Sequence, residues 1–159
     1  MTEDEKFMTL AIQKAREAYA RGDYAIGAVI VENGKVVANG GNRVKTKRDS
    51  TKHVELEIIQ YVVGTKLGTE SGTYLEDCTL YSTHEPCPMC ACAAHWAKVK
   101  RIVFGVTIND IHLYTDEKAY YKWRVVPIKC KETFKGQIKG GVLKQECLKL
   151  LRLPKIKHV

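Results

Sequence analysis

The sequence lacks any long hydrophobic run. No apolar stretch approaches the roughly 20 residues that a helix needs to cross a bilayer, so the composition excludes a membrane-spanning protein. Residues 1–6 are acidic and lack the basic and apolar regions of a secretory signal peptide. There is also no internal repeat and no low-complexity segment. We therefore expect a cytoplasmic protein with no membrane partner.

The length and composition are those of one globular domain. The 159 residues are 45% hydrophobic and 28% charged, which allows a sizeable core. We predict a single domain over residues 1–159, in which residues 140–159 form a basic C-terminal helix and tail. Because no signal peptide accompanies the six cysteines, reduced thiols and a metal site are expected rather than disulfides.

The positive charge is concentrated in the last quarter of the chain. Residues 119–159 hold eleven Lys or Arg against two Glu, a net charge of +9, whereas the whole chain carries +8. Such a basic segment is typical of a nucleic-acid footprint. A solvated, lysine-rich surface would have the same composition, and the sequence leaves both interpretations open.

Hydrophobic periodicity and turn residues predict alternating helices and strands. The Asn33-Gly34 pair marks a hairpin turn between two strands, and Pro127 places a late strand at a sheet edge. The alternation indicates an α/β fold with helices on both faces of a central sheet. Helices are expected at 3–21, 53–64, 87–98, 115–123 and 142–152, and strands at 25–31, 36–38, 79–82, 101–106 and 125–128.

Two short motifs offer metal ligands. His53-Val54-Glu55 and Pro86-Cys87-Pro88-Met89-Cys90 together supply one imidazole, two thiolates and a spare carboxylate. Cys87 and Cys90 share a face if they lie on a helix, and Pro86 favours a helix start there. Three protein ligands leave the fourth tetrahedral position of zinc open for water, as in catalytic sites. Zinc lowers the pKa of a bound water to about 7, and Glu55 could then carry a proton to the substrate.

Two other uses of the cysteine pair have to be weighed. A closed structural zinc site needs a fourth ligand, for which His84 is close enough in sequence. A redox dithiol would need no His-x-Glu partner at all. The spare Glu55 and the open position favour catalysis over both.

Several stretches resemble the cytidine deaminase-like superfamily. Beyond the His-x-Glu and Pro-Cys-x-x-Cys signature of zinc-dependent nucleobase deaminases, the resemblance rests on Ile26–Val31, on Gly41-Asn42-Arg43 and on Leu80–Cys90. These stretches are similar to those of tRNA adenosine deaminases and guanine deaminases. The resemblance implies a three-layer α/β/α fold with a mostly five-stranded mixed sheet, a Zn²⁺ cofactor, a hydrolytic deaminase activity and a homodimer.

The resemblance also implies roles for single residues. His53, Cys87 and Cys90 would bind zinc, and Glu55 would be the catalytic proton shuttle. Asn42 would hydrogen-bond the substrate ring, as a side-chain amide is suited to do. The other expected substrate contacts are Ile26, His84, Glu85 and Pro86, with backbone groups near Glu85 completing the pocket; His84 would otherwise be a solvated loop histidine.

The identity of the substrate depends on which branch the chain resembles more. The Ala93–Ala97 stretch behind the cysteines resembles guanine deaminases, whereas Gly140–Leu151 resembles the last helix of tRNA adenosine deaminases. We expect a deaminase of a free base or nucleoside, with guanine leading, that releases ammonia through attack by zinc-bound hydroxide. The first alternative is a tRNA adenosine deaminase that binds tRNA through the basic C-terminal region. A cytosine deaminase and a non-enzymatic RNA-binding module with structural zinc are the others.

Overall fold

The computed structural model is built on one five-stranded sheet and describes residues 1–66, 74–114 and 128–154. The strand order is β2-β1-β3-β4-β5. The strands are β1 (Gly27–Glu32), β2 (Lys35–Gly41), β3 (Cys78–His84), β4 (Arg101–Val106) and β5 (Gln137–Lys139). Strand β1 is antiparallel to β2 and β3, whereas β3, β4 and β5 run parallel. The expected five-stranded mixed sheet is therefore confirmed.

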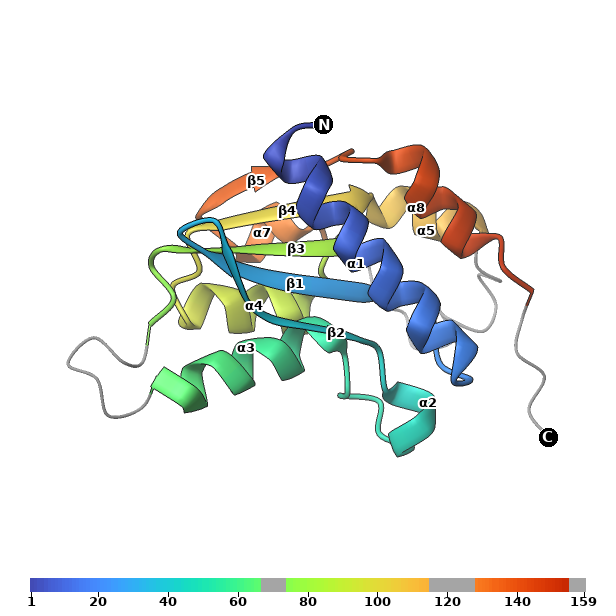
Figure 1. The fold of residues 1–159 in the computed structure, drawn as a ribbon, viewed down its shortest axis with the longest axis horizontal. Helices are drawn as coiled ribbons and strands as arrows, with labels where there is room; N and C mark the ends of the chain where they lie inside the picture. Colours follow the sequence, from blue (N-terminus) through green and yellow to red (C-terminus); the bar gives the residue numbers. More distant parts are fainter. Residues whose placement is uncertain (67–73, 115–127, 155–159) are drawn as a thin grey trace.

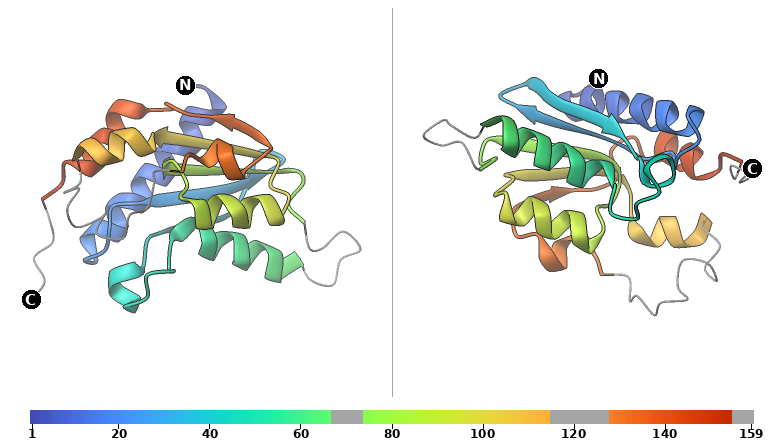
Figure 2. Two further views of the ribbon diagram at one scale, coloured as in Figure 1. Left: turned by 180° about the vertical axis from the view of Figure 1, so that it is seen from behind. Right: turned by 90° about the horizontal axis from the view of Figure 1, so that it is seen from below.

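Helices cover both faces of this sheet, as Figures 1 and 2 show. One face is covered by α1 (Glu3–Ala20) and α8 (Lys144–Leu151), and the other by α3 (Val54–Lys66), α4 (Pro88–Trp96) and the short α7 (Cys130–Thr133). Helix α2 (Val44–Lys47) follows β2, and α5 (Ile108–Tyr114) follows β4 and packs beside α8. This arrangement is the expected three-layer α/β/α fold. Among the described helices, even the 18-residue α1 has a polar face, and none is long and apolar enough to cross a membrane.

Local sequence explains why α1 packs where it does. Thr2 and Glu5 form a capping box that satisfies free backbone N–H groups at the start of the helix. The buried side of α1, with Phe7 and Met8, then lies against the sheet. A Cβ atom on Gly27 would lie 2.0 Å from the carbonyl oxygen of Ala11. Only glycine at this position of β1 therefore allows such close contact between helix and strand.

The expected and observed elements differ mainly near the C-terminus. Helices α5 and α7 fall where no helix was expected, and α2 lies in an expected loop. The fifth described strand, β5, is three exposed residues with no alternating pattern, so only its pairing with β4 defines it. The expected helix at 115–123 lies outside the described residues. The expected strand at 125–128 does too, apart from Ile128, which is not in a strand.

Candidate metal centre and active site

The two sequence motifs meet at the N-termini of two neighbouring helices. His53 directly precedes α3, and its carbonyl oxygen accepts a hydrogen bond from the backbone N–H of Glu57. Cys87 is the N-cap residue of α4, with Pro88 as the first helical residue and Cys90 in the first turn. The helix therefore begins one residue later than expected, and Cys87 lies at its cap rather than within it. Helices α3 and α4 pack side by side, which brings the three side chains together.

The donor atoms of His53, Cys87 and Cys90 form a compact cluster. The Nδ1 atom of His53 lies 3.5 Å from Sγ of Cys87 and 3.7 Å from Sγ of Cys90. All three donor atoms lie within 4.8 Å of one another. A tetrahedral zinc ion, with bonds of about 2.0 Å to nitrogen and 2.3 Å to sulfur, separates such donors by about 3.5 Å. The donor set and its spacing therefore fit zinc.

The two thiols of this cluster differ in acidity. A hydrogen bond from Cys90, followed by one from His53, lowers the pKa of Cys87 well below its usual value. Cys87 also lies at a helix N-terminus, whose partial positive charge favours the thiolate. The hydrogen bond between Cys90 and Cys87, followed by burial, raises the pKa of Cys90. The cluster thus favours the thiolate of Cys87, the form that binds a metal.

Glu55 lies in the first turn of α3, beside the cluster and buried. Its Oε1 accepts a hydrogen bond of 2.8 Å from the hydroxyl of Ser82, and its Oε2 lies 3.8 Å from Sγ of Cys90. Burial is the main cause that raises the pKa of Glu55. Its proton is therefore held more firmly than that of an exposed glutamate, which suits a group that must both take up and give back a proton. Ser82, which orients Glu55, was not identified from the sequence.

The sheet register aligns three of the expected substrate contacts. Gly27 pairs with Gly41, so Ile26 lies opposite Asn42 one position further out; Ala28 pairs with Ser82, so Ile26 lies opposite His84 two positions further out. Asn42, Ile26 and His84 therefore form one row across β2, β1 and β3. The backbone N–H of Asn42 donates to the carbonyl oxygen of Ile26 at 2.9 Å. Side chains two residues apart on a strand share a face. This row therefore lies on the same face of the sheet as Ser82 and its partner Glu55.

Asn42 is fully buried, and a residue that the sequence did not single out holds its side chain. The Nδ2 group of Asn42 donates to Oδ1 of Asp23 at 3.1 Å. Asp23 is itself inaccessible and also accepts hydrogen bonds from the backbone of Tyr24 and from both the backbone and the hydroxyl of Thr46. Because an ionised carboxylate only accepts hydrogen bonds, the amide nitrogen of Asn42 must face Asp23. The amide oxygen is thereby turned the other way.

His84 is buried at the end of β3, which corrects the interpretation of it as a solvated loop histidine. It is 8% exposed, and burial lowers its pKa to about 4. The ring is therefore neutral at physiological pH. Among the residues that the structure describes, the cluster of candidate metal ligands does not include His84. It is thus no fourth ligand, and the alternative of a closed structural site loses its fourth residue.

Glu85 and Pro86 are both buried on the way from β3 to the metal cluster. The Glu85 carboxylate accepts one hydrogen bond from the backbone N–H of Ile108 at 2.8 Å and another from that of Cys130 at 2.9 Å. These residues are the first of α5 and α7, respectively. The Glu85 side chain therefore fixes two helices beside the site, a role that the sequence did not indicate.

Known proteins resemble this chain in both sequence and fold. The profile of the cytidine and deoxycytidylate deaminase zinc-binding region matches residues 1–106. The tRNA-specific adenosine deaminase of Bacillus subtilis (strain 168) is 37% identical over 149 residues, which is 92% of this chain and 85% of that protein. The guanine deaminase of the same strain is 38% identical over 108 residues, covering 67% of this chain and 66% of that protein.

A solved structure from work on A-to-I editing by tRNA:A34 deaminases at the wobble position superimposes with a TM-score of 0.69. It is 30% identical and covers 91% of this chain and 98% of that one. The profile match contains the entire cluster of His53, Glu55, Cys87 and Cys90. The chain therefore belongs to the cytidine and deoxycytidylate deaminase family and is a zinc-dependent hydrolytic deaminase.

Proposed function

We propose that this protein is an adenosine deaminase that acts on tRNA. The observation that carries the proposal is the extent of the match to the B. subtilis tRNA-specific adenosine deaminase, which runs over 149 residues. The match to the guanine deaminase of the same organism spans only 108 residues. A match of 149 residues must extend into the basic C-terminal part of the chain, where positive charge favours an RNA partner.

Guanine, which we expected to be the leading substrate, becomes the second candidate. It keeps support from the 38% identity to the B. subtilis guanine deaminase and from a solved guanine deaminase structure that is 35% identical with a TM-score of 0.63. Cytosine is the third, on the 34% identity to a probable cytosine deaminase of Schizosaccharomyces pombe over 109 residues. Both are tested together with tRNA below.

We assign the metal to His53, Cys87 and Cys90, whose donor atoms have the spacing that zinc requires. When bound, zinc supplies Lewis acidity, which makes water a nucleophile at neutral pH. The remaining steps belong to side chains of the protein. Asn42, held by Asp23, binds the purine ring through its amide.

Glu55 moves the protons of the reaction. Its carboxylate takes a proton from the attacking water and delivers it to the ring nitrogen next to the carbon under attack. The water oxygen bonds to that carbon as a hydroxyl group. Glu55 then takes the remaining proton from this hydroxyl and passes it to the exocyclic amine, so that the carbonyl forms as the carbon–nitrogen bond breaks and ammonia leaves. The 2.8 Å hydrogen bond from Ser82 keeps Oε1 fixed during these transfers.

The assembly and the compartment are part of the same proposal. We propose that residues 1–159 form one domain and that it pairs with a second copy. The neighbouring helices α3 and α4 expose Tyr61 (61%) and Trp96 (81%), large side chains that an interface would cover. The six free cysteines agree with the reducing cytoplasm. Sedimentation of the zinc-loaded protein as a monomer at micromolar concentration would contradict the dimer.

The experiment that tests the function is a substrate panel with zinc-loaded protein. The panel holds an unmodified tRNA with adenosine at the wobble position, the same tRNA with guanosine there, and free guanine, cytosine, adenine and adenosine. We expect inosine in digests of the first tRNA and no ammonia from the other substrates. Ammonia from guanine without inosine in tRNA would instead make the protein a guanine deaminase.

A further inference from the structure

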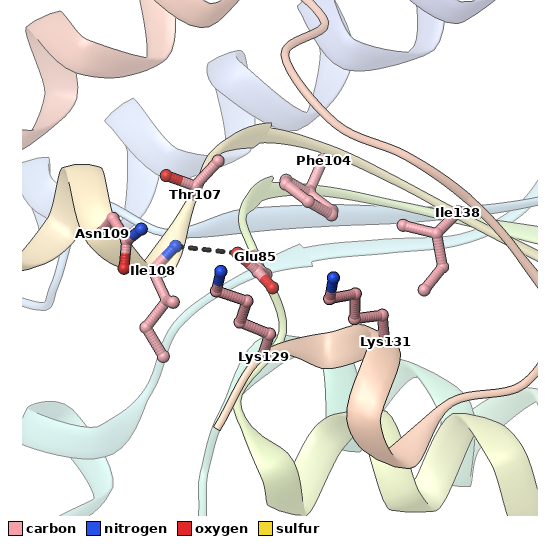
Figure 3. A pocket seen from close by; sticks show the side chains of 8 residues that line it. All are labelled: Glu85, Phe104, Thr107, Ile108, Asn109, Lys129, Lys131 and Ile138. Carbon is pink, nitrogen blue, oxygen red and sulfur yellow. Dashed lines mark hydrogen bonds between the residues drawn. The ribbon is translucent and has the colours of Figure 1, made fainter. Parts of the chain in front are cut away.

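A cavity lies near the metal cluster, between the beginnings of α5 and α7 and the strands β4 and β5 (Figure 3). Its volume is about 240 Å³. This is less than the roughly 300–1,000 Å³ of pockets for drug-sized ligands, so a smaller group would fill it. The residues that matter here are Glu85, Phe104, Asn109, Lys129, Lys131 and Ile138.

The cavity combines apolar walls with polar nitrogen atoms. Phe104 and Ile138 supply the apolar surface from β4 and β5. Figure 3 shows the side chains of Lys129 and Lys131 extending from the start of α7 toward these strands, with Asn109 at the other end. Within the described part of the chain, neither lysine ammonium forms an ion pair and the Asn109 amide forms no hydrogen bond. Three polar groups are therefore available to a ligand.

The cavity adjoins the metal cluster through Glu85. This residue lines the cavity, and Cys87 follows it by two positions. Two residues of extended chain span at most about 7 Å. The cavity therefore lies next to the place where a base would be held at His53, Glu55 and Cys87.

We propose that this cavity binds the nucleotide adjacent to the target base in a single-stranded stretch of RNA. The base would lie against Phe104 and Ile138, and the phosphodiester would lie between the ammonium groups of Lys129 and Lys131. An apolar surface for a base next to cations for the backbone is the usual arrangement in proteins that bind single strands. The amide of Asn109 can read the edge of that base. This inference rests on the proposed function, because a free base has no neighbouring nucleotide.

The charge around the cavity supports RNA over a small metabolite. The Glu85 carboxylate already accepts two backbone hydrogen bonds, one on each oxygen, so these oxygens are bound within the protein rather than to a ligand. The two lysines belong to the C-terminal segment of net charge +9. A polyanion whose chain continues past the cavity can contact this charge, whereas a single base cannot.

Binding of an RNA stem-loop that carries inosine at the target position tests the proposal, because this RNA is a product and does not react further. Affinity is measured with zinc-loaded protein at several KCl concentrations between about 0.05 and 0.3 M. The slope of log affinity against log salt over this range reports the number of phosphate contacts. At the lowest KCl concentration, the double variant Lys129→Ala/Lys131→Ala is expected to bind the stem-loop at least about 10-fold more weakly than the native protein does. Its slope of log affinity against log salt should become shallower by about 0.7, because the two lysines contact one phosphate.

The matched control is Lys35→Ala/Lys100→Ala. It removes the same charge from the opposite end of the sheet, where β2 and β4 begin. We expect its affinity to stay within about threefold of the native value and its slope to be nearly unchanged. Equal losses in the two double variants would show an effect of net charge alone and would overturn the proposal. Melting temperature and zinc content show that each variant is folded.

A second variant fills the cavity without changing charge. Ile138→Trp adds volume where the base is expected. The native protein should bind the intact stem-loop more tightly than a stem-loop RNA that has an abasic residue next to the target. The Ile138→Trp variant should bind these two RNAs equally well. If an abasic residue on neither side of the target weakens binding by the native protein, the proposal is wrong. If inosine formation in tRNA is still observed, the proposed function survives that result.

Discussion

At the scale of single residues, burial decides the chemistry of the site. Glu55 and His84 are both titratable groups enclosed at the same end of β3 and α3, and burial shifts their pKa values in opposite directions. Burial disfavours the charged form of each group, so the glutamate holds its proton more firmly and the histidine gives its proton up. One group is thereby suited to proton transfer, and the other remains a neutral hydrogen-bonding ring.

Glu55→Gln tests the division of roles between the metal ligands and the proton shuttle. We expect turnover to fall by about 10²–10⁴-fold, because Gln keeps the shape but cannot carry a proton. Zinc should stay bound at one equivalent, since the cluster of His53, Cys87 and Cys90 is intact. Elemental analysis and inosine formation on tRNA check the two parts.

The companion variant His53→Ala should lose zinc and activity together. If Glu55→Gln also lost its zinc, Glu55 would be a ligand, and the assignment of roles would be wrong.

At the scale of elements, the buried carboxylate of Asp23 joins three segments near the row formed by Asn42, Ile26 and His84. Asp23 follows the end of α1 and accepts hydrogen bonds from the end of β2, through Asn42, and from α2, through Thr46. These bonds hold the pKa of Asp23 below its usual value despite its burial. We therefore regard Asp23 as a positioning residue for Asn42.

Asp23→Asn should disturb the orientation of Asn42 while leaving the metal cluster in place. The new amide can donate as well as accept, so the Asn42 amide is no longer forced to point its nitrogen at residue 23. We expect the KM for tRNA to rise by about 10-fold, because a misdirected hydrogen bond costs about 1–1.5 kcal/mol. Zinc content should remain at the native level.

Steady-state kinetics on Asp23→Asn, on Asn42→Ala and on the double variant check this account. The second substitution should add little to the first, because both act on the same contact. Strictly additive losses would assign Asp23 a structural role only.

At the scale of the whole molecule, an ion cluster fastens the first helix to three strands. Asp4 of α1 accepts hydrogen bonds from Arg101 of β4 at 2.8 and 2.9 Å and from Lys139 of β5 at 2.6 Å. Tyr81 of β3 donates a further bond at 3.0 Å. Arg101, followed by Lys139 and Tyr81, lowers the pKa of Asp4 far below its usual value. The cluster connects residues that lie up to 135 positions apart.

This cluster should make stability depend on acid. The folded-state pKa of Asp4 lies below the value of about 3.9 in the unfolded chain. Its contribution is therefore complete above about pH 5 and is lost as the pH falls below 4 toward the folded-state pKa. We expect Asp4→Asn to lower the free energy of unfolding by about 2 kcal/mol at pH 7. The difference from the native protein should shrink as the pH falls below 4.

Urea unfolding at several pH values measures this difference. Glu17→Gln is the control, because Glu17 is half-exposed and its side-chain partners among the described residues, Gln13 and Lys14, lie on its own helix. Its effect should stay below about 0.5 kcal/mol at every pH. A constant gap between native protein and Asp4→Asn from pH 7 to pH 2 would contradict the proposed linkage.

The sequence by itself determined the features that depend on neighbours along the chain. Spacing alone indicated the ligands His53, Cys87 and Cys90 and the spare Glu55, because each motif lies at a helix start that local residues define. The helix expected at 3–21, which the structure has at 3–20, and the strand at 101–106 were predicted for the same reason, since their apolar positions follow a regular period. The family resemblance supplied the mixed five-stranded sheet.

Tertiary structure alone decided the features in which distant segments meet. The strand β5 exists only through its pairing with β4, and α5 and α7 are held by Glu85 from another part of the chain. The same holds for Asp23 beside Asn42, for Ser82 beside Glu55 and for the burial of His84. Hydrogen bonds and desolvation depend on which atoms are close in space, and local sequence does not fix the separation of residues that are far apart in the chain.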